Sequence, residues 1–275
     1  MPRFNRLLLA GVFVAELIAA VLLPHDQRPA SAPLVGDRAV QMVNLGGPAT
    51  DRLATDIVSH LGQGVDAVVG FWGPDWTHQI VVLVTGSDDQ FRVAAGGGPA
   101  AQWADIAAVT MVDRVDPSTR TMANGRIVFA PGAVHMSAGA LQIVLTHELF
   151  HYAARVDTAL DAPRWLTEAV ADFVARPGTS RTPLPDSVLG SMASQSLPTD
   201  GDLDVPGPSR SLAYDRGWWF ARFVADSYGP SKLRELYVAA CGVGHSDVPG
   251  AVRTVLGVDT AGLLARWQRW MTSAA

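Results

Sequence analysis

The sequence predicts an α+β fold. A small mixed β-sheet packs on one helix, an N-terminal signal or anchor helix comes first, and a mainly helical C-terminal lobe comes last. Segments of strand composition gather between residues 80 and 130, and segments with helical spacing of apolar residues fill the chain from residue 137 onward. A separate apolar run lies near the N-terminus. The length of 275 residues suits one large or two small domains.

The N-terminal segment, residues 1–32, has the layout of a signal peptide or a membrane anchor with a linker. Arg3 and Arg6 precede an apolar run at 7–23, and a polar tail with prolines follows. The run is shorter than the about 20 residues that span a bilayer, and Glu16 lies in its middle. Cleaved and anchored forms both remain open. Either form places the rest of the chain outside the cytoplasmic membrane, secreted or held there by this segment.

The next elements are a linker, a helix and a strand. Residues 24–40 are rich in Pro, Ala and Asp, which is typical of a linker. Apolar residues at about 49–62 follow helical spacing. The β-branched run at 80–85 predicts a strand, and the Gly-Ser-Asp-Asp sequence at 86–89 predicts the start of a short helix that reaches about residue 95.

Two further strands are predicted at 106–112 and 126–130. Turn signals between them, including Asn124-Gly125, favour antiparallel pairing. An edge strand beside a metal cleft can hydrogen-bond an extended peptide and present its carbonyl to the metal. Either strand is therefore a candidate for substrate binding.

The C-terminal part is predicted to be helical. A polar, proline-rich stretch contains one predicted helix at 186–195, and further helices are expected at 213–228, 230–240 and 260–272. Trp267 and Trp270 are expected to pack inward in the last helix. One domain at 33–273 results, with three parts: a helix-and-sheet lobe at 33–136, two metal-site helices at 137–175 and a helical lobe at 176–273.

The helix predicted from residue 137 carries the pattern His147-Glu148-x-x-His151. A helix advances about 100° per residue, so histidines four positions apart stack on one face. Two such imidazoles can bind one zinc ion from the same side. Glu148 then points beside the metal, which suits a general base acting on a zinc-bound water. The alternative is a helix with two surface histidines.

A third ligand is needed, because a catalytic zinc keeps three protein ligands and one open position. Glu168 is the best candidate, since a short loop at 161–163 can fold the second helix back against the first. Asp172 lies four residues further on the same face, where its carboxylate can accept the N–H of a ligating imidazole. The alternatives are an exposed first-turn glutamate, which the helix dipole favours, and a solvated aspartate.

Two motifs, H-E-x-x-H at 147–151 and W-L-x-E-A-x-x-D at 165–172, resemble those of the gluzincin metallopeptidases. In scale the chain is similar to the compact bacterial peptidase MA-like domains of that group. The motif resemblance covers about 35 residues, and the spacer between the two helices is a little shorter than in the large enzymes. Carried over position by position, the resemblance implies zinc ligands His147, His151 and Glu168, a water-activating Glu148 and a supporting Asp172.

Gluzincins often place a tyrosine or histidine from the C-terminal lobe near the substrate carbonyl oxygen. A hydrogen-bond donor there stabilises the developing oxyanion. The resemblance therefore implies such a residue in this chain. Tyr214 is the candidate, because it lies at the start of a predicted helix. The alternative is a tyrosine that only packs.

These observations lead us to expect a zinc metallopeptidase, a hydrolase with a peptide or protein substrate. The formal net charge of −5 argues against a nucleic-acid surface, and the lone Cys241 excludes an intramolecular disulfide. The alternative is a catalytically silent, exported binding domain that retains the fold. A further alternative is a zinc hydrolase acting on something other than peptides. Glu148 favours the enzyme, because a silent relative has no need of it.

Overall fold

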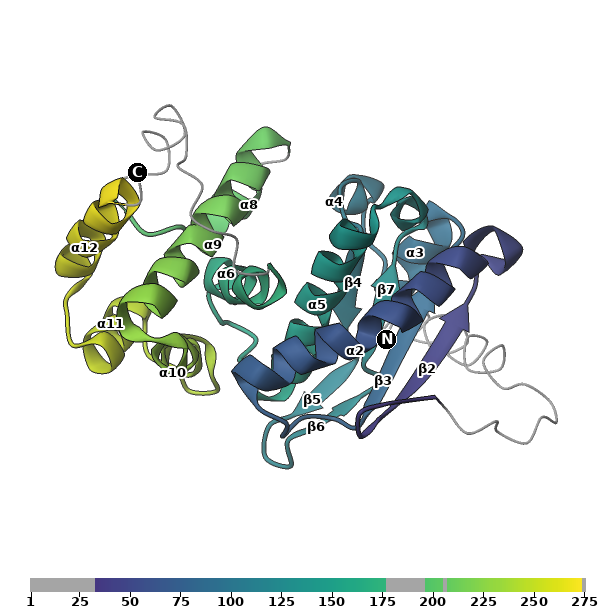
Figure 1. The fold of residues 1–275 in the computed structure, drawn as a ribbon, viewed down its shortest axis with the longest axis horizontal. Helices are drawn as coiled ribbons and strands as arrows, with labels where there is room; N and C mark the ends of the chain where they lie inside the picture. Colours follow the sequence, from purple (N-terminus) through teal and green to yellow (C-terminus); the bar gives the residue numbers. More distant parts are fainter. Residues whose placement is uncertain (1–32, 177–195, 205–206, 274–275) are drawn as a thin grey trace, which may run out of the picture. The chain divides into compact units, whose positions relative to one another are not determined.

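A computed structural model describes residues 33–176, 196–204 and 207–273, and a mixed five-stranded sheet lies in its first half (Figure 1). The strand order is β1-β2-β3-β7-β4. The three central strands run parallel, and the two outer strands run antiparallel to their neighbours. The mixed α+β class and the small mixed sheet are therefore confirmed. The strands are β1 (Leu34–Val35), β2 (Arg38–Asn44), β3 (Gln79–Val84), β7 (Arg126–Phe129) and β4 (Ala108–Met111).

Helices cover both faces of this sheet. Alternate residues of β3, namely Ile80, Val82 and Val84, are fully buried in one core with α2 (Asp51–Trp72) and α5 (Ala138–Ala154). Residues of the opposite parity in β7 and β4 pack with α3 (Asp88–Ala94) and α4 (Ala100–Trp103) in a second core. Each such side chain contributes about 1.5–3 kcal/mol by leaving water. The sheet therefore fixes α5 on one of its faces.

Ser137 caps the N-terminus of helix α5, because its hydroxyl accepts a hydrogen bond from the backbone N–H of Ala140 at 3.2 Å. Leu145, Leu149 and Phe150 are fully buried, because α2, the sheet and α6 (Arg164–Ala175) all contact this helix. A helix that is apolar on most sides belongs in a core. The two histidines and the glutamate of the H-E-x-x-H pattern lie on the side left open, where they line a cleft, whereas the polar Thr146 is buried beside Gly64 of α2.

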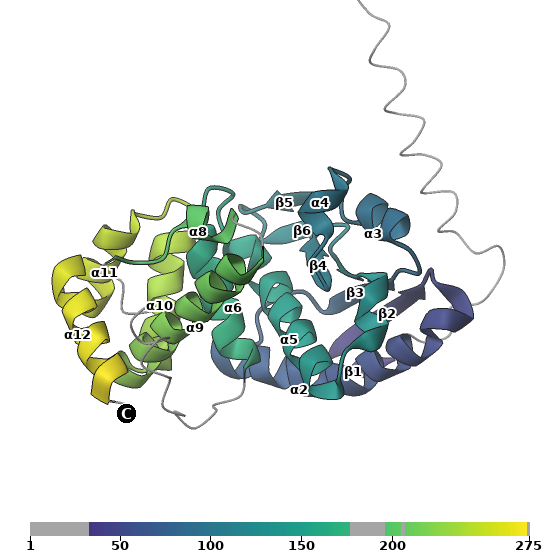
Figure 2. The same cartoon turned by 90° about the horizontal axis from the view of Figure 1, so that it is seen from above.

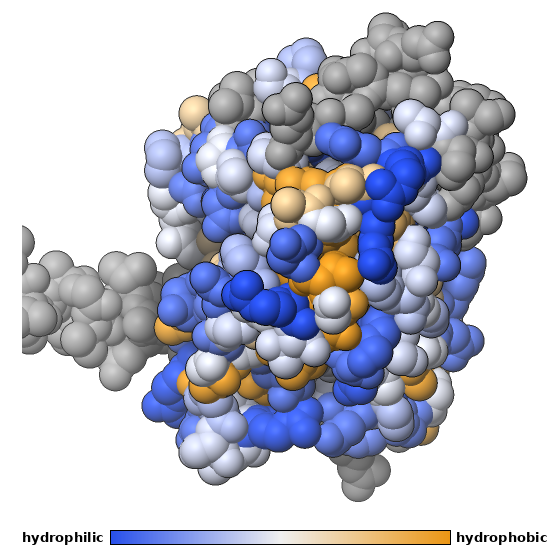
Figure 3. Space-filling view, turned by 90° about the vertical axis from the view of Figure 1, so that its left-hand side faces the viewer, coloured by the Kyte–Doolittle hydropathy of each residue, from blue (hydrophilic) through white to orange (hydrophobic). Residues whose placement is uncertain are grey.

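The described residues of the second half are helical, as expected, and α9 (Pro208–Tyr228) packs along α6 (Figure 2). Trp267 and Trp270 are 2% and 9% exposed, so both pack inward as predicted. Seen from the side of this lobe, the surface is mainly hydrophilic with a small apolar area (Figure 3). Among the described residues, the helices that follow α6 are α8 (Asp200–Asp204), α9 (Pro208–Tyr228), α10 (Pro230–Cys241), α11 (Val248–Leu256) and α12 (Thr260–Ser273).

Several sequence-based assignments were wrong or incomplete. The linker at 24–40 is wrong from residue 34 onward, where β1 and the start of β2 lie. The start of β2 was missed because it carries Arg38, and a charged residue is usually exposed. In the structure Arg38 is only 2% exposed, and its guanidinium lies 3.7 Å from the ring centre of Trp76. Other elements of the described residues were not predicted: the short helices α4 and α8, the helix α11, and the two strands of a hairpin, β5 (Arg114–Asp116) and β6 (Thr121–Ala123).

Two predictions lie outside the described residues: the N-terminal signal or anchor helix and the helix at 186–195. Within the described part of the chain, no helix combines the length and the apolar character needed to cross a bilayer. From Leu34 onward the chain forms one compact unit.

Tyr152 ties α5 to the sheet, and we expect Tyr152→Phe to destabilise the fold by about 1–2 kcal/mol. Its hydroxyl lies 3.1 Å from the carbonyl oxygen of Gln79 and 3.0 Å from that of Gly125, and donates to them. Burial raises the pKa of Tyr152 to about 12. This folded-state pKa exceeds the unfolded value of about 10, so the hydroxyl's contribution is complete below pH 10 and lost as the pH rises through 12. Urea unfolding of the unmodified protein and of Tyr152→Phe measures the difference between their free energies of unfolding. This difference should be smaller at pH 11 than at pH 7.

Candidate metal centre

The two histidines of the motif lie together on one face of α5. Their ring centres are 4.7 Å apart, and the two Nε2 atoms are 3.0 Å apart. Their side chains are 13% and 20% exposed, so both rings are shielded but open to a cleft on one side. The expected stacking on one helix face is therefore what the structure shows.

Glu168 reaches this pair from α6. Its Oε2 lies 3.0 Å from Nε2 of His147, and its Oε1 lies 3.5 Å from Nε2 of His151. Bonds of about 2.0–2.1 Å to one tetrahedral ion separate neighbouring ligand atoms by about 3.3 Å. The three side chains therefore have the spacing of a ligand set, and they form the one group of its kind in the described part of the chain.

The chemistry of these three groups also calls for a cation. Nδ1 of His147 lies 3.0 Å from Oδ1 of Asp172, so this nitrogen carries the proton of a neutral ring. Nε2 of His147 then offers a lone pair, yet it faces a carboxylate oxygen of Glu168 and the other imidazole. Lone pairs meeting at about 3 Å repel unless a proton or a metal ion lies between them. These residues fit a divalent metal ion.

The electrostatics of the site agree with this conclusion. Burial alone would lower the pKa of His147, but hydrogen bonds to Asp172 and Glu168 outweigh it and raise that pKa well above its ordinary value. Burial alone would raise the pKa of Glu168, but the charge of His151 and the hydrogen bond to His147 lower it far below its usual range. Without a metal ion, a bound proton therefore supplies the positive charge that the carboxylates require.

Asp172 occupies the predicted position behind His147, and two residues not predicted for the site support it. Arg176 donates from Nη2 to Oδ2 of Asp172 and from Nη1 to Oδ1 of Asp215 on α9, both at 2.8 Å. The Asp172 side chain is 7% exposed, and Arg176 is the oppositely charged partner that a buried carboxylate requires. The spacing of Asp172 and Arg176, four residues apart on a helix, was a signal that could have identified the pair.

Glu148 lies beside the three candidate ligands and is 7% exposed. Its Oε2 accepts a hydrogen bond from the hydroxyl of Thr110 on β4, at 2.8 Å. The same hydroxyl lies 2.9 Å from the backbone oxygen of Glu148. Thr110 was not identified from the sequence, because no local pattern shows which face of a predicted strand turns toward α5.

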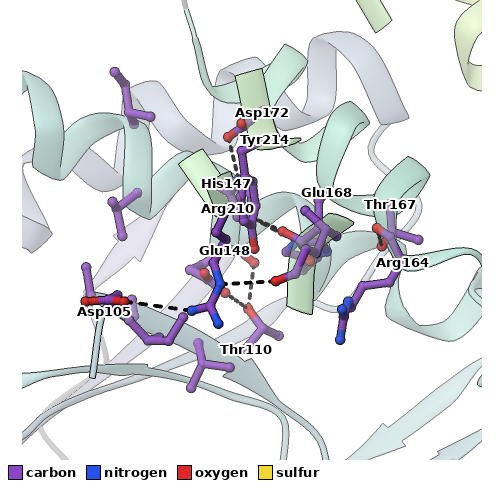
Figure 4. A pocket seen from close by; sticks show the side chains of 18 of the residues that line it. Asp105, Thr110, His147, Glu148, Arg164, Thr167, Glu168, Asp172, Arg210 and Tyr214 are labelled. Carbon is purple, nitrogen blue, oxygen red and sulfur yellow. Dashed lines mark hydrogen bonds and ion pairs between the residues drawn. The ribbon is translucent and has the colours of Figure 1, made fainter. Parts of the chain in front are cut away.

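These groups open onto a cleft of about 1030 Å³ between β4 and the helical lobe (Figure 4). The wall on the sheet side includes Asp105 and Thr110, and the opposite wall includes Arg210 and Tyr214 from α9. Arg210 lies 4.0 Å from Asp105 across the cleft and was not anticipated from the sequence. Tyr214, the predicted oxyanion-stabilising residue, lines the same cleft as all three candidate ligands.

Cys241 is fully buried in α10, and burial raises the pKa of its thiol. Comparison with known proteins does not assign the chain to a family. None of the known protein-family models matches the chain, and a search of curated proteins found no match.

Proposed function

We propose that this protein is a zinc-dependent peptidase that acts outside the cytoplasmic membrane. One observation carries the proposal: ligand atoms of His147, His151 and Glu168 all lie within 4.8 Å of one another, and Glu148 lines the same cleft. Two imidazoles and a carboxylate are a ligand set of catalytic zinc. The export of the chain rests on the basic and apolar residues of the segment at 1–32.

The residues divide the chemistry among themselves. Zinc, when bound, lowers the pKa of water and polarises a carbonyl. His147, His151 and Glu168 would hold the ion, and Asp172 fixes the ring of His147 by accepting a hydrogen bond from its Nδ1–H group. Glu148 accepts a proton from the attacking water and returns it to the leaving amine.

The edge of the sheet supplies a place for the substrate backbone. The backbone N–H of Ala130 donates to the carbonyl oxygen of Ala107 at 2.9 Å, so at this register every second residue of β4 turns its polar backbone groups toward β7. Those of Ala108 and Thr110 therefore point to the free edge, which lines the cleft. Strand β7 is paired on both sides. Of the two candidate strands, β4 is the one that can hydrogen-bond an extended peptide.

A degenerate peptide library, followed by mass spectrometry, tests the proposed activity. We expect cleavage at internal or terminal peptide bonds by the zinc-loaded protein and none after chelation. Restored cleavage on adding zinc back excludes damage by the chelator. A protein that binds zinc at His147, His151 and Glu168 but cleaves no member of the library would instead be the silent, exported binding domain.

Tyr214→Phe should lower kcat by about 10²-fold or more if this hydroxyl stabilises the oxyanion. Burial raises the pKa of Tyr214, and the nearby carboxylates of Glu168, Asp172 and Glu148 raise it further. The phenol therefore keeps its proton at neutral pH and can donate it in a hydrogen bond. Steady-state kinetics on a cleaved library peptide measure the effect. Tyr228→Phe, at the far end of the same helix, is the control, and equal rates for both variants would exclude the role.

A further inference from the structure

We propose that Thr110 is a positioning residue for Glu148, and that it couples the general base to the strand that receives the peptide. The inference rests on the proposed peptidase function and adds a residue to it. Thr110 lies 38 residues from Glu148 in the sequence, and both residues line the cleft. Within the described residues, its hydroxyl bonds to Glu148 and to none of the three candidate metal ligands.

The hydroxyl of Thr110 holds Glu148 at two points. It lies 2.8 Å from Oε2 and 2.9 Å from the backbone oxygen of the same residue (Figure 4). One proton serves both acceptors, so the hydroxyl has a partner whichever way that proton turns. Because Oε2 is occupied in this way, Oε1 is left as the oxygen that can accept a proton from water. A charge-assisted hydrogen bond of this kind is about twice as strong as a neutral one.

The position of Thr110 on β4 connects this contact with substrate binding. Its side chain points toward α5, while its backbone N–H and C=O point to the free edge of the sheet. A peptide that pairs with this edge is therefore held by the same residue that orients the base. Threonine suits the task, because a β-branched side chain has few χ1 states and its methyl group packs while its hydroxyl bonds.

Two substitutions separate the hydroxyl from the shape of the side chain. Thr110→Val keeps the volume and removes the donor, whereas Thr110→Ser keeps the donor and removes the methyl group. We expect Thr110→Val to lower kcat by about 10–100-fold with KM changed less than about threefold, and Thr110→Ser to keep kcat within about threefold. Zinc content should equal that of the unmodified protein in both. An unchanged kcat in Thr110→Val, or an equal loss in Thr110→Ser, overturns the proposal.

A second measurement does not depend on activity. The chain has only four glutamates, Glu16, Glu148, Glu168 and Glu235, so carboxyl-¹³C glutamate labelling gives a spectrum that single substitutions can assign. The Glu148 signal, identified by its disappearance in Glu148→Gln, should move in Thr110→Val and stay in Thr110→Ser, while the exposed Glu235 is unaffected. A Glu148 signal that does not move in Thr110→Val overturns the positioning role. Absence of any peptide cleavage by the unmodified protein would refute the peptidase function separately.

Discussion

Glu148→Gln is expected to retain its metal ion and to cleave peptides about 10²–10⁴-fold more slowly than the unmodified protein. Glutamine has the shape of glutamate but cannot accept and return a proton. Glu148 lies next to His147 in the sequence, yet its Oε2 is bound to Thr110 and not to the His147, His151 and Glu168 group. Removing its charge therefore changes the base and leaves the ligand set in place. Elemental analysis for zinc and cleavage of a library peptide measure the two properties on one sample.

The matched control is Glu235→Gln. Glu235 is 53% exposed and pairs with Lys232 on the surface of α10, so the same chemical change there should leave both zinc content and cleavage intact. If Glu148→Gln cleaved peptides at the rate of the unmodified protein, Glu148 would not be the base. A variant that lost zinc together with activity would show instead that Glu148 supports the ligands.

The parts of the site that could be predicted from the sequence are those that depend on helical spacing. His147 and His151 are four residues apart, and so are Glu168 and Asp172, so the pitch of a helix determines that each pair shares a face. The meeting of the two pairs required only that a short connection return α6 onto α5. That connection consists of a 3-10 turn at Arg155–Asp157 and the residues up to Pro163.

The parts that could not be predicted depend on contacts between distant segments. Thr110 reaches Glu148 because β4 is an edge strand in one particular register, which no local pattern determines. Strand β2 escaped detection because Arg38 is buried: it donates to the carbonyl oxygen of Pro74 at 2.8 Å, and the Trp76 ring covers its guanidinium. A charged residue is expected to be exposed, and only the tertiary fold shows that Arg38 is buried against these partners.

Glu168→Ala is expected to abolish metal binding at this centre, with loss of zinc-dependent stability as well as activity. If zinc binds only the folded state, a free zinc concentration of about 1000 times the Kd adds about 4 kcal/mol to the free energy of unfolding. In a domain of this size, this raises Tm by roughly 8–16 °C. Chelation should lower the Tm of the unmodified protein by that amount. The Tm of Glu168→Ala should not respond to chelator, because one of three donors is missing.

Asp172→Asn provides the graded comparison that distinguishes a ligand from its support. It leaves all three donor atoms in place and weakens the hold on Nδ1 of His147, so zinc affinity should fall by about 10–100-fold and recover at higher zinc concentration. The zinc affinity of Glu168→Ala should fall further, and its zinc content should not recover at higher zinc concentration. Full zinc content in Glu168→Ala would contradict the ligand set. The convergence of two imidazoles and a carboxylate would then be an ion-pair network between α5 and α6, and the catalytic role of Glu148 would lose its basis.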